Sequence, residues 1–369
     1  MKFERPIYVT MPSLAPLSEV NAYLERVWAS GTMTHNGPLV RQFERDFAAW
    51  SGIPRLVAVC NGTVAIQLAL RALDLPPGSE VVTTPFTFVA TLSSILYEGL
   101  KPVFADIDPE TFNIDPAGVE AAVTSRTSAI LPVHVFGNPC DVSAIGAIAE
   151  RRGLRVVYDA AHAVGVRVGG RSLLSFGDAS ATSFHATKLL NTAEGGGVSA
   201  RDDATDRRLR ELRFFGFDDS KSVVRVGTNA KMTEVNASIG LANLARLDAV
   251  VADRRAKYGL YREMLSQSGR LSFQRISDGC NCSYFPVVFE TEDLLLATER
   301  ALNAANVFPR RYFWPSVNSF GAVLPERTSC PVSESLASRI LCLPLYGGLG
   351  MSQVEAIAEM VLECTKEVR

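Results

Sequence analysis

The sequence predicts an α/β fold in which helices cover both faces of a mostly parallel sheet. Short β-branched runs alternate with helical stretches through the first two thirds of the chain. These runs are continuously apolar, as in LVAVC at 56–60, which is typical of strands buried on both faces. With 47% hydrophobic and 21% charged residues among 369, the composition is that of an ordinary folded protein and excludes disorder and fibrous repeats.

The expected strands and helices of this part follow one another along the chain. Runs rich in β-branched or aromatic residues (LVAVC, EVVTT, PVFADI, AILPVHVF and RVVY) predict strands at 56–60, 80–84, 102–107, 129–136 and 155–158. Longer stretches with apolar residues at helical spacing predict helices at 63–73, 88–97 and 142–152. Helices placed between consecutive strands indicate parallel strand pairing.

After Met232 the pattern changes to one long helical segment at 234–265, which leads into a smaller part of the chain. There the sequence predicts strands at 284–289 and 307–313 and helices at 293–304 and 352–366. A length of 369 residues also suggests two domains. We therefore expect a large domain over 1–250, including an N-terminal arm, and a small α/β domain over 251–369.

The charge balance argues against nucleic acid or a membrane surface as a partner. Lys and Arg total 37 against 39 Asp and Glu, a net charge of -2, so no basic binding face is expected. The N-terminus, MKFERPIYV, lacks the apolar core of a signal peptide, and no stretch approaches the ~20 apolar residues of a membrane helix. We expect a cytoplasmic protein whose partners are small molecules or a second copy of itself.

The spacing of the cysteines, histidines and glycines argues against several common metal, nucleotide and hydrolase sites. The seven cysteines are scattered and odd in number, which favours buried reduced thiols. Cys280 and Cys282 have no second pair or histidine nearby, and the four histidines form no H-E-x-x-H motif, so no metal is expected. The chain also lacks G-x-G-x-x-G after a strand, G-x-x-x-x-G-K-[ST] and G-x-S-x-G, which removes the usual signals of dinucleotide, P-loop and α/β-hydrolase chemistry.

Lys188 is the first residue that could carry chemistry. It lies in SFHATKLLNTAEGGG, among small and apolar residues. Such surroundings remove water from the amine, disfavour its charged form and make it nucleophilic near neutral pH. The alternative is that the side chain simply extends along apolar neighbours to the surface.

Asp159 and His162 follow the end of another expected strand. Asp159 closes the strand RVVYD and opens the sequence D-A-A-H-A. Because open α/β sheets bind ligands at the carboxyl ends of their strands, the Asp159 carboxylate could pair with the protonated ring nitrogen of pyridoxal phosphate. His162 could lie beside the same ring. The alternative for Asp159 is a helix N-cap.

A phosphate site and a stacking ring are predicted at the same edge. The turn Asn61-Gly62-Thr63 lies between a strand and a helix, where free N–H groups and the helix dipole favour an anion, and the Ser183 hydroxyl could bind the same phosphate. Phe86 and Phe88 follow the strand EVVTT, and one of them could stack on a flat cofactor. Each feature also has an ordinary role in a turn, a strand or the core. Together they place phosphate, ring, carboxylate and lysine sites at one edge of one sheet.

Many segments resemble, in order and spacing, the pyridoxal-phosphate sugar aminotransferases of the DegT/DnrJ type. The resemblance runs from near Pro6 to the C-terminus and is carried by NGTVAIQLAL, EVVTTPFTFVATLSSILYEGLKPVFADIDPETFNID, LPVHVFGNPCDVSAI, VVYDAAHAVGV, SFHATKLLNTAEGGGV, FFGFD, GTNAKMTEVNASIGL and ILCLPLY. It implies a fold-type I aminotransferase, with a mixed, mostly parallel sheet of seven strands and a smaller C-terminal α/β domain. It also implies a homodimer whose active sites are shared between subunits.

By position, the resemblance implies the cofactor pyridoxal 5'-phosphate and a role for each candidate residue. Lys188 is similar to the Schiff-base lysine, Asp159 to the partner of the pyridine nitrogen and Phe88 to the stacking aromatic. The phosphate contacts are matched by Gly62, Thr63 and Ser183, and by Asn229, which would reach the phosphate from the other subunit. His162 departs from the glutamine of many members, although an imidazole can still hydrogen-bond the phenolic oxygen of the cofactor. Lys188 argues against the dehydrating branch that has histidine at its position.

The resemblance further implies a reaction on a sugar nucleotide. The segments DAAHA, FHATKLLNTAEGG and RRYFWP are similar to those of enzymes that move the amine of L-glutamate to C4 of dTDP-4-keto-6-deoxy-D-glucose. The alternative is C3 amination of a dTDP-3-keto-6-deoxyhexose. By the same analogy, the loop 30–36 and the pair Arg311-Tyr312 would lie near the sugar nucleotide. A non-catalytic regulator or scaffold is the alternative from another class, and it predicts loss of Lys188 or Asp159, which the chain retains.

Overall fold

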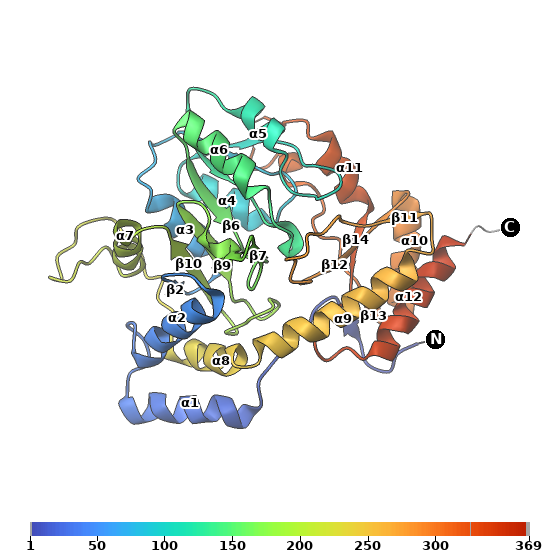
Figure 1. The fold of residues 1–369 in the computed structure, drawn as a ribbon, viewed down its shortest axis with the longest axis horizontal. Coiled ribbons are helices and arrows are strands. Elements are labelled where there is room, and N and C mark those ends of the chain that lie inside the picture. Colours follow the sequence, from blue (N-terminus) through green and yellow to red (C-terminus); the bar gives the residue numbers. More distant parts are fainter. Residues whose placement is uncertain (1, 325, 367–369) are drawn as a thin grey trace.

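A seven-stranded sheet forms the centre of the computed structural model, which describes residues 2–324 and 326–366 (Figure 1). The strands lie in the order β2 (Val57–Val59), β10 (Gly196–Ala200), β9 (Ala179–Ser183), β6 (Arg155–Asp159), β5 (Thr127–Leu131), β3 (Glu80–Thr83) and β4 (Lys101–Phe104). Only β10 is antiparallel to its neighbours. The predicted α/β class with a mostly parallel sheet is therefore confirmed.

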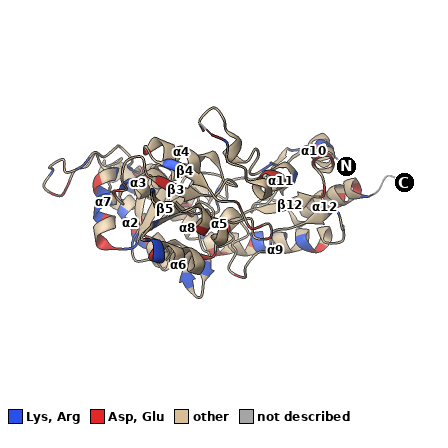
Figure 2. Cartoon of the chain, turned by 90° about the horizontal axis from the view of Figure 1, so that it is seen from above, with Lys and Arg blue, Asp and Glu red and all other residues tan. Residues whose placement is uncertain are grey.

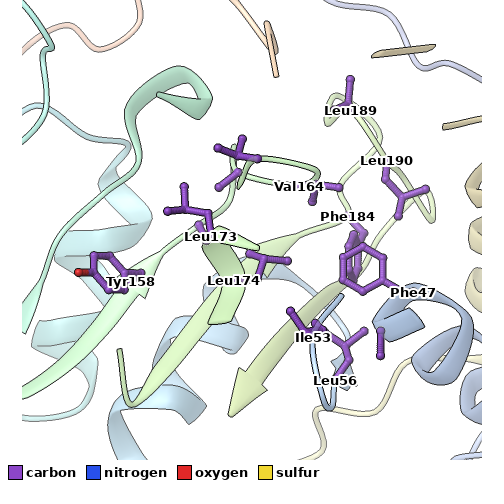
Figure 3. Packing of buried hydrophobic residues seen from close by; sticks show 14 of the residues in the cluster. Phe47, Ile53, Leu56, Tyr158, Val164, Leu173, Leu174, Phe184, Leu189 and Leu190 are labelled. Carbon is purple, nitrogen blue, oxygen red and sulfur yellow. The ribbon is translucent and has the colours of Figure 1, made fainter. Parts of the chain in front are cut away.

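Successive side chains of each strand enter two hydrophobic clusters, one on each face of the sheet. In the first strand, Val57 and Val59 belong to one cluster, whereas Leu56 and Ala58 belong to the other and pack with Phe47 and its neighbours (Figure 3). Strand side chains alternate between faces, so two buried faces require a continuous apolar run. This is the physical basis of the LVAVC pattern.

Helices on both faces supply the rest of these clusters. One cluster draws on α3 (Gly62–Arg71), α4 (Val89–Tyr97) and α7 (Asp203–Arg213). The other draws on α1 (Leu17–Ser30), α2 (Pro38–Ser51), α5 (Pro116–Ala122), α6 (Val142–Arg152) and α8 (Glu234–Leu244). Asn61 begins α3 by accepting a hydrogen bond from Val64 N at 2.9 Å, and Asp141 begins α6 in the same way through Ala144 N.

The C-terminal part has a hydrophobic cluster of its own around a small antiparallel sheet. The sheet holds β11 (Leu271–Ser272), β12 (Phe285–Phe289) and β14 (Ile340–Leu343). Its helices are α9 (Leu247–Leu265), α10 (Glu292–Ala304), α11 (Pro331–Arg339) and α12 (Met351–Thr365). The remaining strands form two short pairs, β1 (Ile7–Tyr8) with β13 (Val307–Phe308) and β7 (Arg167–Val168) with β8 (Arg171–Ser172). The division into domains at 250/251 stays a prediction.

Three elements differ most from their predicted ranges. The helix expected at 234–265 is two helices, because Arg246 leaves the helical conformation (φ -113°, ψ 1°) where the chain passes from packing on α1 and α2 to packing on α12. The strand expected at 129–136 ends at Leu131 and is followed by a 3-10 turn in which Phe136 has φ 58°. The strand expected at 307–313 ends at Phe308, and Arg310 then pairs only with Cys342.

Surface charge and thiols match the expectations from composition. In Figure 2, basic and acidic residues lie side by side on α7 and α9. All seven cysteines are free, and five are buried. Within residues 2–324 and 326–366, no helix combines the length and hydropathy needed to span a bilayer.

Candidate active site

Seven of the eight predicted site residues line one cavity of about 610 Å³. They are Gly62, Thr63, Phe88, Asp159, His162, Ser183 and Lys188. The cavity opens where β6 and β9 end, which is the edge that the sequence predicted. The eighth residue, Asn229, is exposed and accepts a hydrogen bond from Lys231 outside this cavity, so its predicted contact with the other subunit's phosphate stays a prediction.

The backbone around Lys188 is fixed by the two leucines that follow it. Leu189 and Leu190 are buried and belong to the hydrophobic cluster that also holds Phe184 and Phe47, and Figure 3 shows all four side chains. Lys188 itself is partly buried, and its Nζ lies 5.9 Å from the centre of the Tyr284 ring. Packing of the leucines on one side of the loop therefore holds the amine on the cavity side.

Burial makes the Lys188 amine a base that works near neutral pH. Loss of solvation lowers the pKa of Lys188 to about 8, while the negative charge of Asp159 acts in the opposite direction. Near pH 8, about half of the amine is therefore in the neutral, nucleophilic form. The alternative of an ordinary surface lysine does not fit this position.

Asp159 is a buried carboxylate without an ion pair among the described residues. Its Oδ2 accepts a hydrogen bond from Thr91 Oγ1 at 2.8 Å, and its Oδ1 accepts one from Ala161 N at 3.1 Å. The Thr87 and Thr91 hydroxyls are 2.7 Å apart, so Thr87 donates to Thr91 and completes a chain of hydroxyls. Burial raises the pKa of Asp159 above its usual value, against the opposing effects of these two hydrogen bonds and of Lys188. Such a carboxylate is ready to accept a cationic ligand group.

His162 is neutral and its free nitrogen is a donor. Its Nδ1 accepts a hydrogen bond from Phe136 N at 3.3 Å, which places the proton of the neutral ring on Nε2. Burial, with a smaller contribution from the charge of Lys188, lowers the pKa of His162 well below its usual value. The ring lies parallel to those of Phe136 and Phe313, and 4.8 Å from the Tyr284 ring. His162 can therefore donate to an oxygen of a ligand but carries no charge.

The start of α3 and the end of β9 form a cradle for a small anion. Asn61 satisfies Val64 N, which leaves Gly62 N and Thr63 N, at the positive end of the helix, without intrahelical partners. Gly62 lies so close to Ser183 that a Cβ on Gly62 would be 2.7 Å from Ser183 Cβ. Phe88, at the start of α4, has 52% of its surface exposed and is free to cover a flat ligand.

Gly62→Ala tests this close approach. We expect the added methyl group to cost about 1–3 kcal/mol of unfolding free energy through overpacking, and to weaken binding of a phosphate ligand. Thermal unfolding and titration with pyridoxal phosphate measure the two effects. The control is Gly146→Ala in α6, where a Cβ meets nothing within 4 Å and should stabilise the helix by up to about 1 kcal/mol. Equal behaviour of the two variants would contradict the prediction.

Several lining residues were missed by sequence reasoning. Tyr284, Arg310 and Phe313 come from the C-terminal part of the chain and line the same cavity as the residues at the strand ends. The pair Arg311-Tyr312 is confirmed only in part as a neighbour of the site. Tyr312 lines the cavity, but Arg311 turns away and donates to Glu292 and to the Ser338 carbonyl.

The family of the chain is decided by comparison with known proteins. The model of the DegT/DnrJ/EryC1/StrS aminotransferase family matches residues 17–362. The chain belongs to this family. The predicted family and the predicted enzyme class, aminotransferase, are therefore confirmed.

Sequence relatives of this family member are named as dTDP-sugar transaminases. Two dTDP-4-amino-4,6-dideoxy-D-glucose transaminases, from Shigella dysenteriae and Escherichia coli, are 41% and 35% identical and cover 98% and 97% of this chain and 99% of their own length. A dTDP-3-amino-3,4,6-trideoxy-alpha-D-glucose transaminase from Micromonospora megalomicea subsp. nigra is 36% identical over 92% of this chain and 93% of its own.

Solved structures agree with the fold over nearly the whole aminotransferase chain. The structure of DesI in the presence of its TDP-sugar product has a TM-score of 0.92 at 36% identity, covering 99% of this chain and 94% of its own. The structure of NtdA from Bacillus subtilis with bound cofactor PMP has a TM-score of 0.89 at 26% identity, covering 95% and 82%. The fold-type prediction made from the resemblance is thus confirmed.

Proposed function

We propose that this protein transfers the amino group of L-glutamate to C4 of dTDP-4-keto-6-deoxy-D-glucose. The products are dTDP-4-amino-4,6-dideoxy-D-glucose and 2-oxoglutarate, and the cofactor is pyridoxal 5'-phosphate. The observation that carries the proposal is the meeting of Lys188, Asp159 and His162 with the anion cradle of α3 in one cavity. The C4 assignment is supported by the names of the two relatives that match nearly the whole chain.

The residues present fit pyridoxal phosphate at each of its polar groups. Gly62, Thr63 and Ser183 would hold the phosphate, because helix N–H groups and a hydroxyl converge on one small space. The unpaired carboxylate of Asp159 would hold the protonated ring nitrogen. His162 Nε2 would donate to the phenolic oxygen. When bound, this cofactor supplies an electron sink that makes a proton next to an amine removable.

Lys188 and Asp159 have different roles in the proposed reaction. The Lys188 amine would hold the cofactor through a covalent bond, and as a free amine with a lowered pKa it would accept a proton at Nζ and return it. The Asp159 carboxylate would face the protonated ring nitrogen, because the hydrogen bonds from Thr91 and Ala161 fix its orientation. Phe88, which lines the cavity, would cover the ring against water.

Absorption spectroscopy with each substrate added in turn tests the proposal. We expect a visible band after incubation with pyridoxal phosphate, bleaching of the band by L-glutamate and its return on addition of dTDP-4-keto-6-deoxyglucose. Bleaching without return would move the acceptor to a 3-keto sugar, as the name of the Micromonospora relative suggests. A protein that forms no band with added cofactor would be a regulator or scaffold, and the enzymatic proposal would be wrong.

We also propose a homodimer with shared active sites that works in the cytoplasm. Leu14, Leu17 and Trp28 expose 69%, 71% and 69% of their surface on the N-terminal arm and α1, which supports an apolar contact with a second copy. Asn229 lies outside its own cavity, where it would be free to serve a partner. Free cysteines support a reducing compartment. Sedimentation analysis and cell fractionation measure the two properties, and a monomer would contradict the first.

A further inference from the structure

Arg310 is the one arginine among the residues that line the candidate active-site cavity. Among residues 2–324 and 326–366, no acidic side chain or carbonyl pairs with its guanidinium. Its neighbour Arg311 has the opposite surroundings: it forms an ion pair with Glu292 at 2.6 Å and lies 4.3 Å from the Trp314 ring. The two consecutive arginines therefore differ in their partners: Arg311 is paired with Glu292, whereas the Arg310 guanidinium is available to a ligand.

The guanidinium of Arg310 is held at the cavity by its own backbone and by an aromatic ring. Arg310 N donates to Cys342 O at 3.1 Å, and Cys342 N donates to Arg310 O at 2.8 Å, so β14 fixes the position of this residue. Its Cζ lies 4.9 Å from the centre of the Tyr312 ring, and that ring contacts Tyr284, beside Lys188. Stacking on an aromatic face restricts a guanidinium without using its five N–H donors.

The charges at the cavity leave an anion-binding role open to Arg310. Glu194 Oε1 lies 3.7 Å from His185 Nε2, and Asp159 is assigned to the cofactor ring. Lys188 is assigned to a covalent bond and to proton transfer. Arg310 is then the permanent cation of the cavity without an assigned partner. Arg310 is exposed and therefore accessible to a ligand from solvent.

We infer that Arg310 binds the oxyanion of a substrate, and this inference rests on the proposed function. Both proposed substrates carry such a group outside their reacting atoms: a carboxylate in L-glutamate and a diphosphate in the sugar nucleotide. A planar guanidinium binds either group through two parallel N–H···O hydrogen bonds. Arg310 is thus a specificity residue that the fold supplies from the C-terminal part of the chain.

The inference is tested by equilibrium binding of two probes that cannot react, glutarate and dTDP, to the cofactor-loaded protein. Titration calorimetry compares the wild type with Arg310→Gln, Arg310→Lys and the matched control Arg311→Gln. Losing a charge-assisted hydrogen bond should weaken binding about tenfold to a hundredfold in Arg310→Gln. Lysine keeps the positive charge but lacks the paired N–H donors of the guanidinium, so Arg310→Lys should bind the probes more tightly than Arg310→Gln and less tightly than the wild type. Arg311→Gln should bind both probes within about threefold of the wild type.

The two probes identify the source of the oxyanion. A selective loss of glutarate binding in Arg310→Gln assigns Arg310 to the amino donor, a selective loss of dTDP binding assigns it to the sugar nucleotide, and loss of both assigns it to both in turn. Unchanged binding of both probes overturns the inference, as does an equal loss in Arg311→Gln or a wild type that binds neither. The spectral response to L-glutamate is measured separately, so failure of the proposed reaction is distinguished from failure of this site.

Discussion

Lys188→Ala is expected to lower the rate of amino transfer by more than about 10⁴-fold. Removal of a general acid or base alone typically costs 10²–10⁴-fold, and this variant also loses the amine that bonds to the cofactor. The visible band of the loaded protein should disappear with the covalent bond. Product formation from L-glutamate and the 4-keto sugar, followed by chromatography, measures the rate, and an absorption spectrum measures the bond.

Controls separate lost chemistry from lost folding in the Lys188→Ala protein. Thermal unfolding should change little, because the substitution leaves Leu189 and Leu190 in their cluster and removes a partly buried amine. Lys101→Ala, at an exposed position on β4, should keep wild-type turnover. An added small primary amine should restore part of the activity of Lys188→Ala, since it can carry protons in the vacated space. Near-normal turnover of Lys188→Ala would remove Lys188 from the mechanism.

The part of the site built on strand ends could be predicted because parallel strands bring their carboxyl ends to one edge. Asp159 closes β6, and Ser183 closes β9 five residues before Lys188. Gly62 opens the helix that follows β2. Asp159 and Gly62 lie one turn or less from strands that the apolar pattern predicts, whereas the strand that Ser183 closes, ASATS, is not an apolar run. The topology of the sheet then places these residues together, although Gly62 and Lys188 are 126 positions apart in the sequence.

The part of the site that comes from the C-terminal part of the chain could not be predicted in the same way. Tyr284 and Arg310 lie about a hundred residues or more beyond Lys188 in sequence, and only the packing of the C-terminal part brings them to the cavity. The motif RRYFWP indicated that this segment approaches the site. It could not tell which arginine faces inward, because the answer depends on Glu292, the partner that holds Arg311 on the other side.

Local pattern also fails where packing partners change within a helix. No proline or glycine lies between Gly240 and Gly259, yet the helix is interrupted at Ala245 and Arg246. The segment before the break packs on α1 and α2 and the segment after it packs on α12, so tertiary contacts override helix propensity. The pair of Thr87 and Thr91 is a second case. Thr91 lies in the first turn of α4, whereas Thr87 precedes the helix, so helical spacing alone does not predict the contact between their hydroxyls.

Asp159→Asn is expected to lower kcat about 10²- to 10³-fold while the cofactor still binds. Asparagine has the size of aspartate, and its amide oxygen can still accept the hydrogen bond from Thr91 or Ala161. It lacks the negative charge that would hold the ring nitrogen in its protonated form, so the electron sink is weakened. Because Lys188 is intact, the visible band should remain. Rapid mixing with L-glutamate measures how fast that band bleaches.

Stability distinguishes this loss of charge from a structural defect. Asp159 is 6% exposed and has no ion pair among the described residues, so its charge opposes folding in the absence of cofactor. The cofactor-free Asp159→Asn protein should therefore unfold at the same temperature as the wild type or higher. Thr91→Val keeps the charge and removes one hydrogen bond, and its kcat should fall only about tenfold. An Asp159→Asn protein that bleaches at the wild-type rate, or that loses both stability and activity, would show that the carboxylate supports the fold instead of the reaction.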